Sequence, residues 1–333
     1  MSRTGIRLGL LSFIFAGFGL VFAQKTDSPQ KADWEKRLAE GRTRRALGRY
    51  IEAEQVFKTL LREVEGGGHD IFVASVLDNL ALTEQDLGNF MAAESLLTRS
   101  LSILKKTGGA AEARVADVEG QLGEVYLEEG RPREAEPLFR RALEIRQNAP
   151  QPDAAGLSVS MADLAMVYKS EGKFHQAEAL LLKALALLEE RFGPDDPMVA
   201  SALGPLGATL IREGRKKEAL AVTERTWEIL HKDPRVAEPD LINTMNTLGM
   251  LYSLAGRFQE AEFFGREAVV KAETVYGPEH PRLGWHLANY AQILKRMGRK
   301  GEARAVEQRS AAILADSRHA NPVRDTVNVN ALR

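Results

Sequence analysis

Residues 168–178 read YKSEGKFHQAE, and the main features of this stretch recur along most of the chain. Its glycine, Gly172, is one of seven that are spaced first by 40 residues and then always by 42. The seven are Gly48, Gly88, Gly130, Gly172, Gly214, Gly256 and Gly298. Each is followed five residues later by alanine, and seven residues before each there is glycine or alanine. A fixed period of this length indicates an array of structural repeats.

Each repeat predicts two helices joined by a turn at the glycine. Apolar residues recur at helical spacing before the turn, as at Leu164 and Val167, and again after it, as at Leu181 and Leu188. The glycine suits a turn that needs positive φ, and the small flanking residues let the two helices approach closely. One such hairpin cannot bury its apolar face alone. The sequence therefore predicts that seven hairpins stack into one all-α solenoid.

Three segments of the repeat resemble a known family. They are Leu164-Ala165 with Tyr168 before the turn, Gly172 with Phe174 at the turn, and Ala177-Glu178 after it. Together they resemble the tetratricopeptide repeat (TPR), and the 42-residue period resembles its kinesin-light-chain type. The linkers GPDDP at 193–197 and GPEHP at 277–281 strengthen the likeness. The resemblance covers about residues 33–315 and implies a right-handed α-solenoid of about seven TPR-like hairpins.

The first 23 residues have the pattern of a signal peptide. Arg3 and Arg7 precede an uncharged apolar run at 8–22, and Ala23 offers a small residue at a cleavage site. The alternative is an uncleaved anchor, although the run is short for a span of about 20 residues. We expect export to the periplasm or secretion, and no membrane contact after cleavage. A flexible leader at 24–32, the repeats at 33–315 and a disordered tail at 316–333 are predicted to follow.

The composition limits the possible partners and chemistry. The chain has 333 residues, 44% of them hydrophobic, which is enough for a large core, and the repeat favours a single elongated unit. Its 45 basic and 46 acidic residues nearly balance, so no nucleic-acid partner is expected. The absence of cysteine excludes disulfides, thiolate metal sites and a cysteine nucleophile.

Two repeats depart from the pattern. Pro205 falls inside the first helix of repeat 5, where proline costs about 3 kcal/mol or bends the helix. A functional bend and a tolerated kink both remain possible. The first helix of repeat 1 is rich in charge, including Arg42, Arg44 and Arg45. These arginines form either an anion-binding entrance to a groove or the solvated cap that a terminal repeat needs.

No motif for catalysis or metal binding is found. The six histidines form no His-Glu-x-x-His or similar pair, and His175 at a turn and His280 in a linker are expected to be solvated. Neither a nucleophile elbow nor a dinucleotide-binding glycine motif occurs. We therefore expect no enzymatic activity, no metal and no cofactor.

A row of polar residues lies nine positions before the glycines. The resemblance implies that the first helix of each hairpin lines a concave groove, and that residues of this row contact peptide cargo. It carries that role to Asn79 and Asn289 most directly, and amides suit a peptide backbone because they both donate and accept. Residues three positions before the glycine, such as Lys169 and Lys295, should also face inward. The predicted groove comprises Asn79, Gln121, Asp163, Lys169, Thr247, Asn289 and Lys295.

These observations favour an exported, monomeric TPR scaffold that binds a protein or an extended peptide in its groove. One alternative is an accessory or regulatory subunit of an enzyme encoded elsewhere. Another is a self-associating component of a larger envelope complex, which would use the end repeats or exposed regions around Trp227 and Trp285. The polar residues at the ends of the array argue against self-association. The polar row also fits ordinary exposed helix positions.

Overall fold

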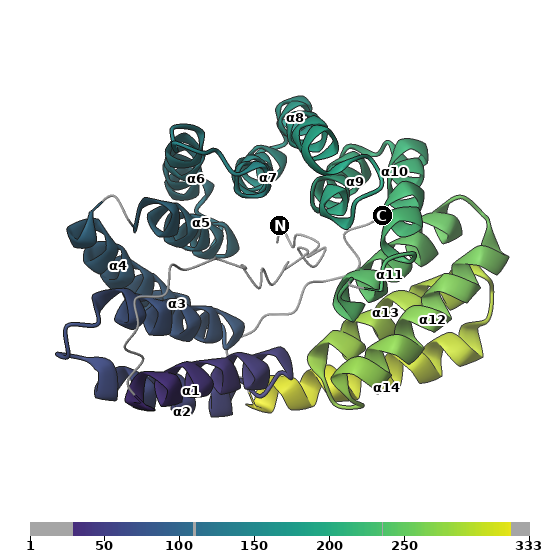
Figure 1. Ribbon diagram of the computed structural model, residues 1–333. Coiled ribbons are helices and arrows are strands. Elements are labelled where there is room, and N and C mark those ends of the chain that lie inside the picture. Colours follow the sequence, from purple (N-terminus) through teal and green to yellow (C-terminus); the bar gives the residue numbers. More distant parts are fainter. Residues whose placement is uncertain (1–28, 109–110, 235, 321–333) are drawn as a thin grey trace. The chain divides into compact units, whose positions relative to one another are not determined.

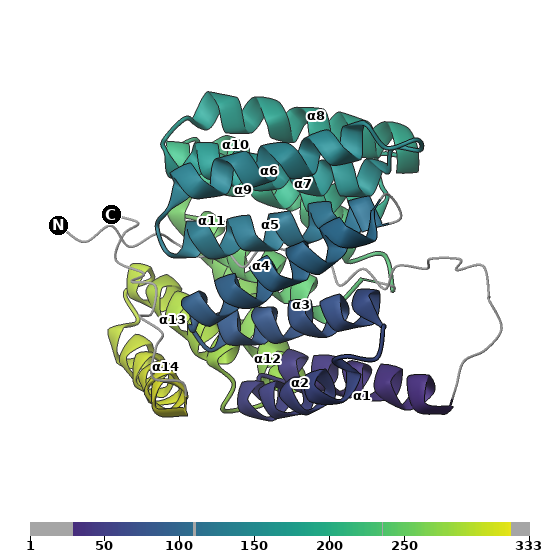
Figure 2. The ribbon, with the colours of Figure 1, turned by 90° about the vertical axis from the view of Figure 1, so that its left-hand side faces the viewer.

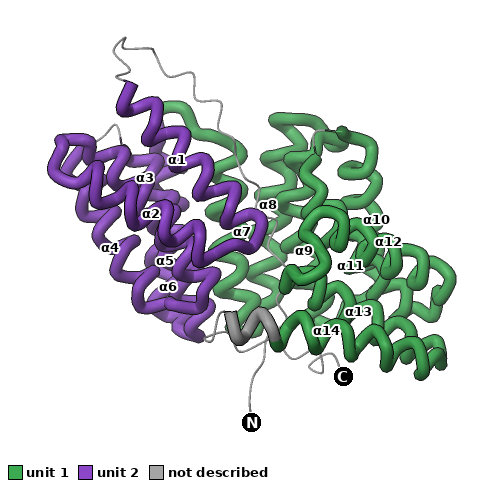
Figure 3. The backbone as a smooth tube through the Cα atoms, turned by 90° about the horizontal axis from the view of Figure 1, so that it is seen from below, with its two compact units in different colours: residues 1–11, 150–333 green, residues 12–149 purple. Residues whose placement is uncertain are grey.

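The computed structural model describes residues 29–108, 111–234 and 236–320. These residues form fourteen α-helices and one short 3-10 helix, without a strand, which confirms the predicted all-α solenoid of helical hairpins. The chain divides into two compact units (Figure 3). We call residues 29–149 the N-terminal unit and residues 150–320 the C-terminal unit. The division lies between repeats 3 and 4, next to Pro150 and Pro152, whereas the repeat alone predicts one unit.

The N-terminal unit contains three hairpins, coloured purple to teal-blue in Figure 1. Their helices are α1 (Pro29–Ala46) with α2 (Tyr50–Val64), α3 (Asp70–Asp86) with α4 (Phe90–Thr107), and α5 (Glu112–Glu128) with α6 (Pro132–Gln147). Each second helix also packs against the first helix of the next hairpin, as α2 does against α3. The hairpins therefore stack side by side within the unit (Figure 2).

The C-terminal unit contains four hairpins built in the same way. Their helices are α7 (Ala154–Ser170) with α8 (Phe174–Phe192), α9 (Ala200–Glu213) with α10 (Lys216–Leu230), α11 (Glu238–Leu254) with α12 (Phe258–Tyr276), and α13 (Pro281–Arg296) with α14 (Lys300–Ala320). The 3-10 helix η2 (Pro197–Val199) precedes α9.

The ends of the helical array extend beyond the predicted limits. Helix α1 begins at Pro29, four residues before the expected start at Asp33. Proline is compatible with this position because the first turn of a helix does not need its missing N–H. Helix α14 continues to Ala320, past the expected end at 315. The signal peptide at 1–23 and the tail from 321 onward lie outside the described residues.

The glycines adopt the predicted turn conformation. All seven have positive φ, for example 77° at Gly172 and 90° at Gly214. The following residue returns a hydrogen bond to the first helix, as Lys173 N–H does to the Tyr168 carbonyl over 2.8 Å. This pairing satisfies carbonyl groups that would otherwise be orphaned at the helix end.

Size complementarity fills the space between the two helices of a hairpin. The small residue before the turn faces the residue sixteen positions later. Gly41 lies against the ring of Phe57, and a Cβ at Gly123 would stand 2.7 Å from the ring of Phe139. Both rings are fully buried. In hairpins 2 and 4 the corresponding pairs are Ala81 with Leu97 and Ala165 with Leu181.

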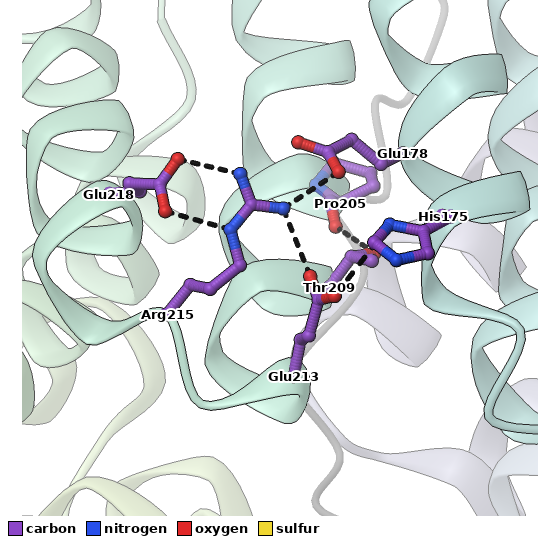
Figure 4. Close-up of polar contacts among 7 residues, drawn as sticks. All are labelled: His175, Glu178, Pro205, Thr209, Glu213, Arg215 and Glu218. Atoms are coloured by element: carbon purple, nitrogen blue, oxygen red, sulfur yellow. Dashed lines mark hydrogen bonds and ion pairs between the residues drawn. The ribbon is translucent and has the colours of Figure 1, made fainter.

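The helix containing Pro205 is continuous. Helix α9 runs from Ala200 to Glu213 with Pro205 inside it. The Pro205 carbonyl accepts a hydrogen bond from the Thr209 hydroxyl over 2.9 Å (Figure 4). At 14 residues, α9 is shorter than the other described first helices, and η2 replaces its first turn.

An arginine directly after the turn glycine ties neighbouring hairpins together. Arg215 bonds to Glu218 in its own turn over 2.7 and 2.6 Å, to Glu213 over 3.0 Å, and to Glu178 of the preceding hairpin over 2.7 Å (Figure 4). Arg131 and Arg299 stand at the same register and make the same kinds of contact, Arg131 with Glu94, Glu129 and Glu134, and Arg299 with Glu262 and Glu302. These clusters hold the turn edge of each unit, and their acids are occupied by structural partners.

Candidate functional site

First helices of neighbouring hairpins contact each other in both units. Helix α1 contacts α3 and α3 contacts α5 in the N-terminal unit, while α7 contacts α9 and α11 contacts α13 in the C-terminal unit. Successive second helices are farther apart, because each is separated from the next by a first helix. We call the surface that the first helices share the inner face of each unit. The predicted groove residues all belong to these first helices.

On the inner face of the N-terminal unit, Asn79 is already engaged. The Arg42 Nε–H donates to its Oδ1 over 3.0 Å, and its own Nδ2 donates to the Ser75 carbonyl over 2.7 Å. Asn79 is consequently buried, with 9% of its surface exposed. Arg42 therefore links α1 to α3. This structural role differs from both predicted roles of the basic first helix, the anion-binding entrance and the solvated cap.

A buried carboxylate, Asp78, lies next to this pair. It accepts a hydrogen bond from the Ser100 hydroxyl over 2.5 Å and another from the Arg114 guanidinium over 3.0 Å. Burial raises the pKa of Asp78 to about 6 despite these two partners. Burial and the neighbouring Arg114 lower the pKa of Arg42. The inner face of this unit therefore holds two mutually repelling arginines around one buried acid.

A second contact on this face follows a simple register. Arg45, three positions before its turn glycine, donates to Asp86 over 2.6 Å, and Asp86 lies two positions before the next glycine. We call such a pair, formed by these two positions on successive first helices, a rung. The Arg45–Asp86 rung joins opposite charges.

The C-terminal unit has an amide pair on its inner face. The Asn289 Nδ2 on α13 donates to the Asn246 Oδ1 on α11 over 3.2 Å, and both side chains are half-buried. The neighbouring Thr247 donates its hydroxyl to the Asn243 carbonyl of its own helix over 2.9 Å. The Arg296 Nε–H donates to the Ser253 carbonyl over 3.2 Å, which makes a second, hydrogen-bonded rung.

Lys169 and Arg212 form a third rung with a different character. Lys169 is half-buried in the last turn of α7, and Arg212 is exposed in the last turn of α9. Among the residues that the structure describes, neither side chain has an ion pair or a hydrogen bond. Burial and the nearby Arg212 lower the pKa of Lys169 to about 8.

The remaining predicted residues differ in what they offer to a ligand. Gln121 on α5 is half-buried, and its Oε1 has no hydrogen-bond partner in the described part of the chain. Asp163 on α7 is buried. Lys295 on α13 is exposed but pairs with Glu307 of α14. The structure thus places the seven predicted residues on the first helices, and it gives protein partners to Asn79, Asp163, Thr247, Asn289 and Lys295.

Sequence reasoning missed several residues of this face. Asp78, Arg114 and Asn246 fall one or more positions away from the predicted row, although Asn246 directly precedes Thr247 in the sequence. Arg114 and Asp78 meet across two hairpins, 36 residues apart. Asp78 and Asn246 each stand ten positions before a turn glycine, whereas Arg114 stands sixteen positions before its own, so a comparison of charges at one register does not find the Asp78–Arg114 pair.

Three predicted exposures need correction. His280 is buried because it caps α13, where its Nδ1 accepts the Arg282 N–H over 3.1 Å, and its ring lies 5.0 Å from that of Tyr276. His175 is exposed, as expected. Trp227 and Trp285 are half-buried rather than exposed, since Trp227 packs against Phe264 at 5.4 Å and the Trp285 Nε1 is shielded from solvent.

In the described ranges, no three His, Cys, Asp or Glu side chains are placed so that they could hold a metal ion. None of the described helices is long and apolar enough to span a bilayer.

Comparison with known families identifies the repeat. The family model of the tetratricopeptide repeat matches residues 37–106, 70–148, 112–190, 157–230 and 240–316. The chain therefore belongs to the tetratricopeptide repeat family. No match is found among curated proteins.

Solved structures of other repeat proteins share the fold. A kinesin light chain-like protein of Podosopora anserina with nearly identical TPR-like repeats is 21% identical, covers 62% of this chain and 98% of its own, and has a TM-score of 0.52. BtubC (BKLC) from P. vanneervenii is 22% identical over 75% of this chain and 94% of its own, with a TM-score of 0.52. The Rap conjugation gene regulator of plasmid pLS20, in complex with the Phr* peptide, is 14% identical over 94% and 83%, with a TM-score of 0.63. These likenesses confirm the expected solenoid of TPR-like helical hairpins, including its resemblance to kinesin light chain-like repeats.

Proposed function

We propose that this chain is a scaffold that binds a protein, through an extended peptide segment, along the inner faces of its units. The Asn246–Asn289 pair carries the proposal. The pair makes one internal hydrogen bond, from the Asn289 Nδ2 to the Asn246 Oδ1, and within the described chain the Asn246 Nδ2 and the Asn289 Oδ1 have no further partner. A peptide backbone presents the matching carbonyl and N–H groups.

The family and the fold support this proposal. Repeat solenoids use extended surfaces for recognition, and the Rap regulator of pLS20 has been solved with a bound peptide. Asn79 is a weaker candidate than the resemblance implies, because Arg42 and the Ser75 carbonyl already occupy its amide.

The test is selection of binding peptides from a random display library by residues 24–333, followed by affinity measurement of the selected peptides. We expect Asn246→Ala with Asn289→Ala to weaken binding about tenfold or more, because two hydrogen bonds of about 1 kcal/mol each are lost. Gln259→Ala with Gln308→Ala is the matched control, since these exposed amides lie on the second helices α12 and α14. Equal losses in both double variants would contradict binding at the inner face.

We also propose that the protein is exported. The arginines and the apolar run at 1–23 support this location, which places the partner in the periplasm or outside the cell. N-terminal sequencing of the protein recovered from separated cell fractions tests it. Cleavage before Gln24 in an exported fraction is expected, and an intact N-terminus in the cytoplasmic fraction would refute the proposal.

A further inference from the structure

A histidine side chain caps the first helix of hairpin 7, which consists of α13 and α14. Elsewhere in the described chain, the side-chain caps at the start of first helices are aspartates, Asp153 at α7 and Asp196 at η2 ahead of α9. Asp196 and His280 are both the fourth residue of their linkers, GPDDP and GPEHP. An aspartate keeps its charge in mildly acidic solution, whereas an imidazole accepts a hydrogen bond through Nδ1 only while that nitrogen has no proton.

The geometry of the cap sets the protonation state of His280. The Arg282 backbone N–H can only donate, so the His280 Nδ1, 3.1 Å away, accepts with its lone pair. Protonation would turn this acceptor into a donor that faces another donor. It would also place a cation at the N-terminus of α13, where the helix dipole favours an anion. His280 is buried, so water cannot replace the lost hydrogen bond while the hairpin stays packed.

A second histidine of α13, His286, is equally buried. Its Nδ1 has no hydrogen-bond partner in the described part of the chain. Burial, together with the charges of Arg282 and His280, lowers the pKa of His286 to about 4. A histidine in water binds its proton near pH 6.5, so a falling pH favours any state in which His286 is exposed. At the same register, hairpins 2 and 3 have the apolar residues Val76 and Val118.

Most acids near the start of α13 are already paired. Glu273 of α12 binds Arg309 of α14, and Glu238 of α11 binds Lys271 of α12. Asp240 of α11 acts in the opposite sense to the histidines, because burial raises its pKa to about 6 and its protonation favours the packed state. The other charged or titratable groups in this region are Tyr276 of α12, Glu279 of the linker and Arg282 of α13.

We propose that His280 and His286 make hairpin 7 acid-sensitive: when the two histidines bind protons, α13 and α14 open away from α11 and α12. Hairpin 7 packs through α13 on α11 and α12, and it is an end unit of the described array. An end unit has one neighbouring hairpin and opens without disturbing the others. The opening also separates Asn289 of α13 from Asn246 of α11, the pair that carries the proposed function.

Hydrogen exchange followed by mass spectrometry tests the opening on residues 24–333, which contain every described helix. Asp240→Asn is introduced first, to remove the opposing titration. After correction for intrinsic rates, exchange in α13 and α14 should accelerate at least tenfold between pH 7 and pH 5. The titration of His286 alone, from about pH 6.5 when open to about 4 when packed, accounts for roughly 20-fold. Equal changes in α7 and α8, or none in hairpin 7, would overturn the inference.

Variants assign the effect to the two histidines. His280→Asp with His286→Val, added to the Asp240→Asn protein, copies the residues that other hairpins have at these places, Asp196 and Val76. The cap and the packing are therefore retained, and exchange in hairpin 7 should change less than threefold between pH 7 and pH 5. His175→Asp with His231→Val, at exposed histidines of hairpins 4 and 5, is the control and should keep the full acceleration. Acceleration that persists without His280 and His286 would refute their role.

The link to the peptide surface rests on the proposed function and has its own readout. A peptide selected at pH 7 that binds the Asn246–Asn289 pair should slow exchange in hairpin 7 at pH 5, because it binds the packed state and not the open one. A selected peptide that binds at pH 5 but leaves this exchange unchanged would show that the opening does not involve the peptide surface. Failure to select any peptide would count against the proposed function, while exchange of the free protein still decides whether hairpin 7 opens.

Discussion

In hairpins of both units a glycine stands seven positions before the turn glycine, but it packs against different partners in the two units. In the N-terminal unit, Gly123 makes room for the ring of Phe139, which fills the space between α5 and α6. In the C-terminal unit, the residue that faces Gly249 is Gly265, and a Cβ on Gly249 would lie 3.0 Å from the backbone nitrogen of Gly265. One hairpin is held apart by a ring, and the other is closed backbone to backbone. A small residue at this position leaves room between the two helices of the hairpin. The residue sixteen positions later determines whether a side chain fills this room or the two backbones close it.

The largest expected effect comes from removing the ring that fills the first kind of hairpin. Phe139→Ala should lower the free energy of unfolding by about 3–5 kcal/mol, because a fully buried aromatic side chain leaves a cavity between α5 and α6. Urea unfolding measures the change. Phe263→Ala is the control, since this ring is half exposed on α12. A comparable loss in the control would show that aromatic content, and not the filling of the glycine site, determines stability.

A second comparison concerns two buried carboxyl groups, Asp78 in the N-terminal unit and Asp240 in the C-terminal unit, and the pH at which each titrates. Burial raises the pKa of Asp78, as described, and that of Asp240 to about 6 as well, with Arg282 opposing the shift. An unfolded Asp titrates near 3.9, so the native state binds more protons between about pH 4 and pH 6. The free energy of unfolding should therefore fall as the pH rises through this window, by roughly 3 kcal/mol for each group.

Asp78→Asn and Asp240→Asn should each remove one part of that slope. Urea unfolding at pH 4, 5, 6 and 7 measures it, and Asp195→Asn, in an exposed loop of the C-terminal unit, serves as the control. Asp78 has hydrogen bonds from Ser100 and Arg114, so its variant should lose more stability at pH 7 than the variant at Asp240. A slope that persists in both variants would assign the pH dependence to other groups.

The sequence predicts the repeat, its turns and the small residues between the helices, because these depend on contacts within one hairpin. It does not predict which polar residue of one hairpin meets which of the next. Asn79 was expected to face a ligand, yet its Oδ1 accepts a hydrogen bond from Arg42, which lies 37 residues earlier in the chain. His280 was expected in solvent, yet it caps a helix and is buried. Such pairings depend on how the hairpins stack, which the period alone does not determine.

A smaller effect sharpens the comparison of the two glycine sites. Alanine at Gly123 and alanine at Gly249 should each destabilise by about 1–3 kcal/mol through overpacking, partly offset by about 1 kcal/mol of better helix propensity. The two losses should differ in how they can be repaired. Gly123→Ala with Phe139→Leu recreates the Ala–Leu pair of hairpins 2 and 4, so much of its stability should return.

No such repair is expected at Gly249. Its Cβ would meet the backbone of Gly265 at 3.0 and 3.2 Å as well as the Ile293 side chain at 3.1 Å. Gly249→Ala with Ile293→Val therefore removes only one of the contacts. Double-mutant cycles by urea unfolding measure the coupling in each pair. Equal recovery in both cycles would mean that the close backbone contact between α11 and α12 is not what limits the size of residue 249.

The smallest expected change concerns a charge buried in the N-terminal unit at a position where repeats 2 and 4–7 have apolar residues. Glu119 on α5 is fully buried, and the corresponding residues are Leu77 on α3 and Leu203 and Leu287 in the C-terminal unit. Its Oε1 lies 3.1 Å from the Lys105 Nζ and 3.4 Å from the Arg141 Nε, but neither carboxylate oxygen makes a hydrogen bond among the described residues. The desolvation of Glu119 is thus only partly offset.

Glu119→Leu should leave the free energy of unfolding unchanged or raise it by about 1 kcal/mol, because a buried ion pair often gains nothing over a well-packed apolar residue. Lys105 and Arg141 are largely exposed and can turn to water when the acid is removed. Glu119→Ala is the matched variant, and it should destabilise because it leaves a cavity in addition. If Glu119→Leu costs as much as Glu119→Ala, the two cations give the N-terminal unit a stabilising contact that the leucines of the C-terminal unit do not replace.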